Sequence, residues 1–310
     1  MSRSPARVDD AACPIVLVAL DGSPAAATAL PIAAAVARQI GGRLGVLHVA
    51  ARAVSAPDIA RALGLTGPDW ESIPVRVEVG DPVERILRAT EDPDVALLVL
   101  TTHGREITSG ERLGSVARRI VARAMRPILL VRPGPAAGKE AIAAEIRRIM
   151  IPVDGSEVTL RALGPVLALA GRLGAEIDIL YVVEPGRAPR RERGGMTLPR
   201  YVDQPQHEWP EWAREVVDHL CACAGQCVPG RHPRVFLARG EASDQIARVA
   251  AARQVDALVL VRSSRLEPGH GRVLLSLLTS GPCPALLVGA NLPVAEPTAA
   301  PERAEAAADA

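Results

Sequence analysis

Residues 15–30 read I-V-L-V-A-L-D-G-S-P-A-A-A-T-A-L, and residues 149–163 read I-M-I-P-V-D-G-S-E-V-T-L-R-A-L. Each stretch is an apolar run of strand length that ends in Asp-Gly-Ser and continues into a helical pattern. The chain therefore contains the same strand, turn and helix twice. Such a repeat constrains the fold more strongly than any single element does.

The correspondence between the two halves continues in the same order along the chain. The paired segments are 33–49 with 166–182, 75–87 with 235–249, 96–100 with 257–261, and 126–131 with 283–288. Strands that alternate with helical segments imply right-handed βαβ crossovers and a parallel sheet. We expect an α/β protein of two tandem flavodoxin-like or Rossmann-like domains. Each would be a five-stranded parallel sheet with helices on both faces.

The domain boundaries follow from changes in composition along the chain. We expect a flexible N-terminus at 1–12, a first domain at 13–133, a linker at 134–146, a second domain at 147–290 and a disordered tail at 291–310. The linker is rich in Pro, Gly and Ala, and the tail in Ala, Pro and Glu.

Composition excludes several classes of protein. The chain has 36 Lys and Arg against 35 Asp and Glu, so it carries no overall charge for binding nucleic acid or an anionic membrane. Aromatic residues make up 2%, which leaves few platforms for stacking bases. No apolar run is long enough to span a membrane, and five cysteines without a secretion signal indicate free thiols. We therefore expect a cytoplasmic protein.

The loop after the strand at 95–100 contains the main functional signal. Residues 103–115 read H-G-R-E-I-T-S-G-E-R-L-G-S. In open parallel sheets, ligands bind beyond the carboxyl ends of the strands, where the strand order reverses. We expect Gly104 to turn the backbone with positive φ, and Gly114 and Ser115 to open a helix whose N–H groups can hold phosphate. The Ser115 hydroxyl would either cap that helix or bind a phosphate oxygen.

These residues resemble the universal stress protein family, whose nucleotide-binding members carry G-x-x-G, nine residues, then G-S or G-T. Here Thr101 to Gly104, nine further residues and Gly114-Ser115 match that spacing, with Thr101 in place of the first glycine. The resemblance extends to Asp-Gly-Ser after the first strand and to P-I-L-L-V at the last strand. It covers nearly all of both halves.

The resemblance implies an ATP site in the first domain, with Mg²⁺ accompanying the nucleotide. Asp21 and the main chain around Val49 would face adenine, and Thr101 would lie near the ribose. His103, in the same loop, would either shape the turn or touch the ribose. The residues implied around the phosphates are Gly104, Arg105, Gly114, Ser115 and Val116. The implied function is a regulatory stress-response module. A nucleotide-independent dimerisation scaffold is the alternative, and a slow ATPase is a weaker one.

The second half departs from this pattern in its corresponding loop, which is about four residues shorter. Arg265 stands where Gly104 would be, and Arg272 where Ser115 would be. We expect the second domain to have lost nucleotide binding while keeping a structural role. The family resemblance also implies that the last strands, 127–131 and 284–288, pair antiparallel within the chain. A homodimer and an unknown protein partner remain open.

Other motifs support no enzymatic or metal site. The linker segment G-P-A-A-G-K-E lacks the length and the hydroxyl residue of a Walker loop. His219, Cys223 and Cys227 share a helical face that could hold zinc, although thiols packed in a core explain them more simply. His103 has no nucleophile or carboxylate spaced to form a triad, so we expect no enzyme. The arginine-rich insertion at 185–210 is either a solvated loop or a docking segment.

Overall fold

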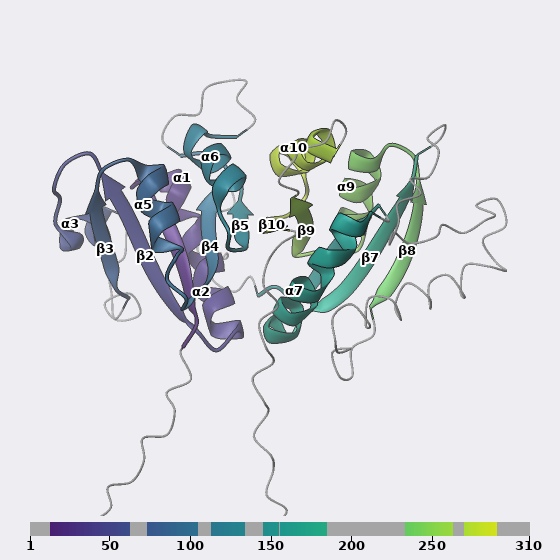
Figure 1. Cartoon of the computed structure of the whole chain (residues 1–310), viewed down its shortest axis with the longest axis horizontal. Helices are drawn as coiled ribbons and strands as arrows, with labels where there is room; N and C mark the ends of the chain where they lie inside the picture. The colour runs from purple at the N-terminus through teal and green to yellow at the C-terminus, as the bar shows by residue number, and fades with distance from the viewer. Residues whose placement is uncertain are drawn as a thin grey trace, which may run out of the picture.

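The protein is described from a computed structural model, which covers residues 13–62, 73–104, 113–133, 145–154, 156–184, 233–262 and 270–289. The predicted N-terminal segment, most of the linker, the insertion at 185–210 and the tail lie outside these described residues. Two α/β halves stand side by side and share one sheet (Figure 1).

Both halves follow the predicted alternation of strands and helices. The first half contains β1 (Ile15–Leu20), α1 (Pro24–Ala27), α2 (Ala29–Gln39), β2 (Arg43–Ala50), α3 (Ala56–Ala62), β3 (Val75–Val79), α5 (Pro82–Ala89), β4 (Val95–Thr101), α6 (Ser115–Arg123) and β5 (Ile128–Val131). The second contains β6 (Arg148–Val153), α7 (Glu157–Leu173), β7 (Glu176–Val183), β8 (Arg234–Arg239), α9 (Ala242–Ala252), β9 (Ala257–Arg262), α10 (His270–Ser280) and β10 (Ala285–Gly289).

The sheet has ten strands in the order β3-β2-β1-β4-β5-β10-β9-β6-β7-β8. Within each half all neighbouring strands are parallel, and the order within a half is 3-2-1-4-5. Of the two related folds expected, this order is the Rossmann-like one, in which the strand order reverses between the first and fourth strands. The predicted fold class is confirmed. Among the described helices, none has the length and apolar character needed to cross a membrane.

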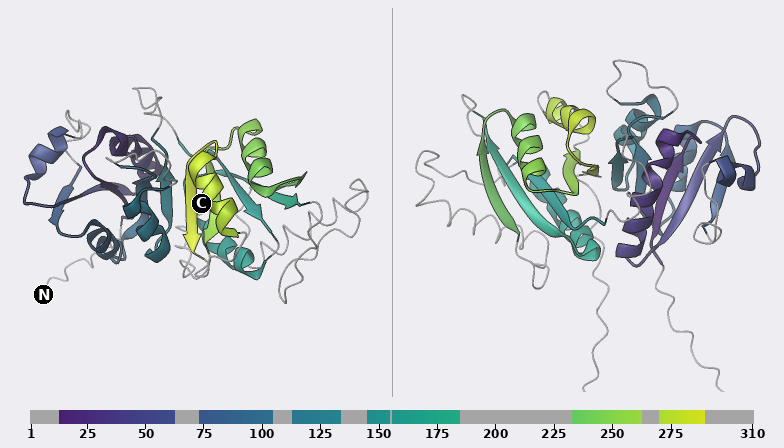
Figure 2. Two further views of the ribbon diagram at one scale, coloured as in Figure 1. Left: turned by 90° about the horizontal axis from the view of Figure 1, so that it is seen from above. Right: turned by 180° about the vertical axis from the view of Figure 1, so that it is seen from behind.

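The two halves join through their last strands, as predicted. β5 and β10 are antiparallel neighbours, with Leu130 opposite Ala285, Leu129 opposite Leu286, and Ile128 opposite Leu287. Figure 2 shows the two halves meeting along this line from above and from behind. All six of these residues are buried, so the junction is part of the core. The chain thereby forms an intramolecular pair of domains, whereas a homodimer remains a prediction.

The core consists of two apolar layers, one on each face of the shared sheet. On one face, α2 and α7 pack over the strands, and on the other α5, α6, α9 and α10 do so. Each layer runs through both halves without a break. On the face covered by α2 and α7, Gln39 of α2 makes hydrogen bonds across the boundary between the two halves. Its amide nitrogen donates to the carbonyl oxygens of Ile146 and Leu173, both at 3.0 Å, and its amide oxygen accepts the Ile146 N–H at 2.9 Å.

The repeated Asp-Gly-Ser sequence has a structural explanation in both halves. Ser23 and Ser156 are the N-caps of α1 and α7, and their hydroxyl oxygens accept a backbone N–H from the first turn. The carboxylates of Asp21 and Asp154 accept the N–H groups of these serines at 2.8 and 3.1 Å, which holds the turn. The motif therefore sets the strand-to-helix turn, whether or not a ligand is bound.

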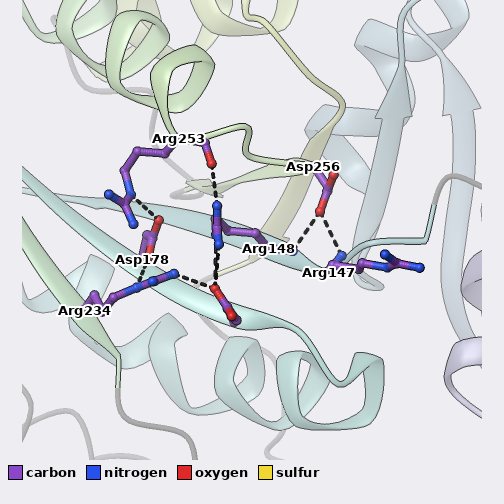
Figure 3. A network of polar contacts seen from close by, with 7 residues as sticks. Arg147, Arg148, Asp178, Arg234, Arg253 and Asp256 are labelled. Atoms are coloured by element: carbon purple, nitrogen blue, oxygen red, sulfur yellow. Dashed lines mark hydrogen bonds and ion pairs between the residues drawn. The ribbon is translucent and has the colours of Figure 1, made fainter.

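A network of charged groups, which sequence reasoning missed, lies at the start of the second half's strands (Figure 3). The fully buried carboxylate of Asp178 on β7 contacts Nε of Arg234 at 3.0 Å and Nε of Arg253 at 2.6 Å. Arg253 also lies over the ring of Phe236, 4.0 Å from its centre. Asp256 accepts the backbone N–H groups of Arg147 and Arg148, just before and at the start of β6. These contacts connect β6, β7, β8 and α9.

Candidate functional site

A cavity of about 260 Å³ lies at the carboxyl edge of the first half's strands. It sits beside β1 and β4, where the strand order reverses, which is where this fold is expected to bind ligands. The residues lining it are Ala19, Leu20, Asp21, Ala26, Leu47, Val49, Pro82, Ile86, Leu100, Thr101, Thr102, Gly104, Gly114, Ser115, Val116 and Ala117. Seven of the nine residues predicted for the site are among them.

The floor of the cavity is apolar. Ala19, Leu47 and Leu100 come from three neighbouring strands and are buried in the same core layer as Ile86 of α5. Val49 on β2 continues this surface. A mostly apolar cavity with a few polar groups is suited to an aromatic ring of a small molecule.

The polar end of the cavity is formed by the start of α6. Gly114 is the N-cap of this helix and has no side chain to satisfy the N–H groups of the first turn. Its own N–H donates to the carbonyl oxygen of Thr102 at 2.8 Å, which fixes the helix start against the end of β4. Ser115 is the first helical residue and Gly114 is the N-cap, so of the two roles expected for the Ser115 hydroxyl, capping the helix is excluded and phosphate binding stays a prediction. Ser115 is among the residues that line the cavity.

Gly104 lies against Asp21, and this contact explains why the position holds glycine. A Cβ atom at Gly104 would lie 3.2 Å from Cγ of Asp21 and would overlap its Oδ2 atom. The predicted positive φ is wrong, since Gly104 is not among the described residues with positive φ. Close packing against the carboxylate, and not an unusual backbone conformation, therefore excludes a side chain here.

The remaining predicted residues divide into three cases. Thr101 ends β4 and lines the cavity. His103 is half-buried, with Nδ1 3.1 Å from Oγ1 of Thr102, and is not part of the described cavity wall. Arg105 lies outside the described residues.

One wall of the cavity was not predicted, whereas His48 was expected at the end of its strand and has a structural role there. Pro82 and Ile86 of α5 form one wall of the cavity. The sequence Asp81-Pro82, which marks the start of a helix after β3, could have indicated that a helix lies here. His48 on β2 is 4% exposed, and its Nδ1 lies 2.8 Å from the carbonyl oxygen of Leu20. Because a carbonyl can only accept, Nδ1 carries the proton. This bond ties the ends of β1 and β2 together beside Asp21.

Two ion pairs hold α5 against α6, the two helices that wall the cavity. Nη1 of Arg119 lies 3.4 Å from Oδ2 of Asp81, and Nη1 of Arg123 lies 2.6 Å from Oε1 of Glu84. The pKa of Asp81 is lowered mainly by the Glu84 backbone N–H and then by Arg119. The hydrogen bond from Arg123 lowers the pKa of Glu84. Both pKa values are below their ordinary ones, so the pairs stabilise the fold above pH 4.5 and lose this contribution as pH falls.

We expect the Arg123→Ala substitution to raise the pKa of Glu84 toward its ordinary value of 4.5, because the main group that lowers it is removed. An NMR titration of the Glu84 side-chain carboxyl carbon measures this directly. The Arg118→Ala variant is the control, since its side chain comes from the same helix and makes no described contact with Glu84. An unchanged Glu84 pKa in the Arg123→Ala protein would contradict the pairing.

The corresponding region of the second half differs in its described part. Arg272, at the position of Ser115, is exposed. The pKa of Glu241, the N-cap of α9, is lowered mainly by the Ser243 hydroxyl and the Asp244 N–H, and least by the charge of Arg272. α10 already begins at His270, two residues before Arg272, so the helix starts earlier than α6 does.

Arg265 lies outside the described residues, as do His219, Cys223 and Cys227. Within the described ranges, no group of three His, Cys, Asp or Glu side chains could hold a metal ion.

Comparisons of the sequence with known proteins identify the same family for both halves. The family model described as "Universal stress protein family" matches residues 14–132 and 145–289. A universal stress protein of Methanothermobacter thermautotrophicus is 37% identical over 71 residues, which span 22% of this chain and 48% of that relative. The chain thus spans about half the length of this curated relative.

Solved structures resemble both halves together. A universal stress protein from Archaeoglobus fulgidus has a TM-score of 0.62 at 16% identity, covering 89% of this chain and 98% of that one. A putative universal stress protein from Pseudomonas aeruginosa has a TM-score of 0.55 at 13% identity, covering 90% and 93%. A universal stress protein in complex with cAMP covers 47% of this chain, at 19% identity and a TM-score of 0.33.

Proposed function

The chain belongs to the universal stress protein family, and we propose that its first domain binds ATP, with Mg²⁺, as a regulatory module of the stress response. The start of α6 carries this proposal. Its N-cap, Gly114, offers no side chain to the first-turn N–H groups, and Gly114, Ser115 and Val116 line a largely apolar cavity. Such a helix end attracts phosphate through its N–H groups and its positive dipole.

The lining residues divide naturally between the parts of the nucleotide. Adenine would lie on the apolar floor beside Val49 and Asp21, and the ribose near Thr101. A cavity of about 260 Å³ is slightly smaller than the roughly 300–1,000 Å³ typical of ligand pockets. It therefore suits the nucleoside, while the phosphates would extend over the start of α6. The backbone at Gly114, Ser115 and Val116 would hold them there.

Mg²⁺ would neutralise phosphate charge when bound with the nucleotide. Asp21 is the only carboxylate in the described cavity wall, and it already accepts the Ser23 N–H. This donor set is too small for a dedicated metal site, which favours an ion held largely by the phosphates. We further propose that ATP is held and not hydrolysed.

Isothermal titration calorimetry with MgATP tests the proposed function, with cAMP titrated in parallel. We expect the Gly104→Ala protein to bind ATP on the order of tenfold more weakly than the wild type, because the new methyl group must displace Asp21 from the cavity. Ser115→Ala should have a smaller effect in the same direction.

Arg272→Ala is the matched control for this experiment, since it alters the equivalent position of the second half and should leave ATP affinity unchanged. Equal affinity of the wild-type and Gly104→Ala proteins would contradict the site. Wild-type protein that produces no heat with ATP, and releases no adenine nucleotide on denaturation, would instead favour the nucleotide-independent scaffold.

A further inference from the structure

Arg262, the last residue of β9 in the second half, reaches across the domain boundary to the end of α6 in the first. Its Nη1 atom donates to the carbonyl oxygen of Val121 at 2.6 Å, and its Nη2 atom donates to that of Ala124. Val121 lies in the last turn of α6, and Ala124 is the C-cap. One guanidinium therefore binds two carbonyl groups at this helix end.

The contact places a positive charge at the negative end of the helix dipole, where a cation is stabilised. Burial lowers the pKa of Arg262, and its buried Nε has no hydrogen-bond partner among the described residues. No described carboxylate forms an ion pair with it. Burying a charge without a counter-ion is costly, so the carbonyl groups of α6 are what compensates this guanidinium.

A second arginine makes a similar contact in the opposite direction. Nη1 of Arg132, which follows β5, lies 3.4 Å from the carbonyl oxygen of Thr279 near the end of α10. The repeat aligns Arg262 with Thr101 and Arg132 with Gly289, so the two contacts come from non-equivalent positions. Symmetry of the repeat does not produce the Arg262 contact. The α6 contact is also closer than the α10 contact.

We propose that Arg262 is a positioning residue through which the second domain fixes the phosphate-binding end of the first domain's site. α6 connects Arg262 to the phosphate-binding end of the site, because its start lines the cavity and its end binds Arg262. A helix of nine residues is about 14 Å long and moves nearly as one body. This proposal rests on the proposed function of the first domain.

The experiment compares the Arg262→Met, Arg262→Lys and Arg132→Met proteins with the wild type. Methionine keeps much of the aliphatic length of arginine but removes the charge and the donors. Calorimetry measures the affinities for ATP and for adenosine, which lacks phosphate. We expect Arg262→Met to bind ATP roughly fivefold more weakly and adenosine unchanged, because only the phosphates depend on the start of α6.

Arg262→Lys should recover part of the ATP affinity, since it keeps the charge, and Arg132→Met should bind like the wild type. Wild-type ATP affinity in the Arg262→Met protein would overturn the proposal. An equal loss for ATP and adenosine would also overturn it, because a general loosening of the domain would affect both ligands.

Hydrogen exchange separates this proposal from the proposed function. If the wild type binds no ATP, the proposed function fails, but Arg262→Met should still reduce amide protection in Ser115–Arg123 while Arg132→Met does not. Unchanged protection of α6 in the Arg262→Met protein would overturn the positioning role. If Arg262→Met does not fold, Arg262→Lys takes its place in both measurements. The expected losses of ATP affinity and of amide protection in α6 are then smaller.

Discussion

The Asp178→Ala substitution should lower the free energy of unfolding by roughly 3 kcal/mol. The Asp178 carboxylate is fully buried between the guanidinium groups of Arg234 and Arg253. Without it, two arginines face each other with no charge between them, and Arg253 is only 26% exposed. Removing one partner of a buried ion pair is costly where the remaining charge is kept from water, which holds more for Arg253 than for Arg234, whose side chain is 45% exposed. Urea denaturation followed by circular dichroism measures the change.

Glu176→Ala is the control for Asp178→Ala, since it removes a carboxylate from the same strand and the same network. Glu176 is 54% exposed and pairs with Arg148 and Arg234 near the surface. Exposed ion pairs contribute little to stability, so this variant should unfold at nearly the wild-type urea concentration. Equal losses in the two variants would mean that burial of Asp178 has no special importance.

This network marks the limit of what sequence alone predicted. The fold was predictable because strand and helix patterns are local, and because the second half repeats the first. Asp178 stands where the first repeat has Gly45, within an apolar strand, and its two partners are 56 and 75 residues away. No local pattern indicates which charges will meet at that distance, so the network required coordinates.

Much of the candidate site could also be predicted, because its residues stand at the ends of predicted strands. Parallel strands bring their carboxyl ends to one edge, so Asp21, Val49, Thr101 and the α6 start could be placed together from strand assignments alone. The wall formed by α5 and the contact from Arg262 depend on how helices pack on the sheet, and sequence spacing does not report this. The reason for glycine at 104 was also missed, because it is a contact with Asp21 and not a turn.

The largest effect on ATP affinity is expected from Gly114→Asp. Gly114 has φ −56° and ψ 148°, a conformation open to any L-residue, and aspartate is among the best N-cap residues. A Cβ at this position would lie 3.3 Å from the carbonyl oxygen of Thr102, which requires only a small shift. The variant should therefore fold, with a free energy of unfolding within about 1 kcal/mol of the wild type.

Its ATP affinity should nevertheless fall on the order of 100-fold. The new carboxylate would accept the N–H groups that the phosphates need and would repel the phosphate charge, and like charges in contact cost several kcal/mol. Calorimetry with MgATP measures the affinity, and thermal unfolding measures the stability of the same sample. Adenosine should bind as it does to the wild type, because it places no charge at this helix end.

Gly114→Asn separates the charge from the shape of the new side chain. Asparagine caps a helix about as well as aspartate and has nearly the same size, but it is neutral. It competes for the same N–H groups without repelling phosphate, so its loss of ATP affinity should be about tenfold. If the two variants bind ATP equally, charge at the start of α6 is not what holds the phosphates. If Gly114→Asp binds ATP as tightly as the wild type, the nucleotide does not use this helix end.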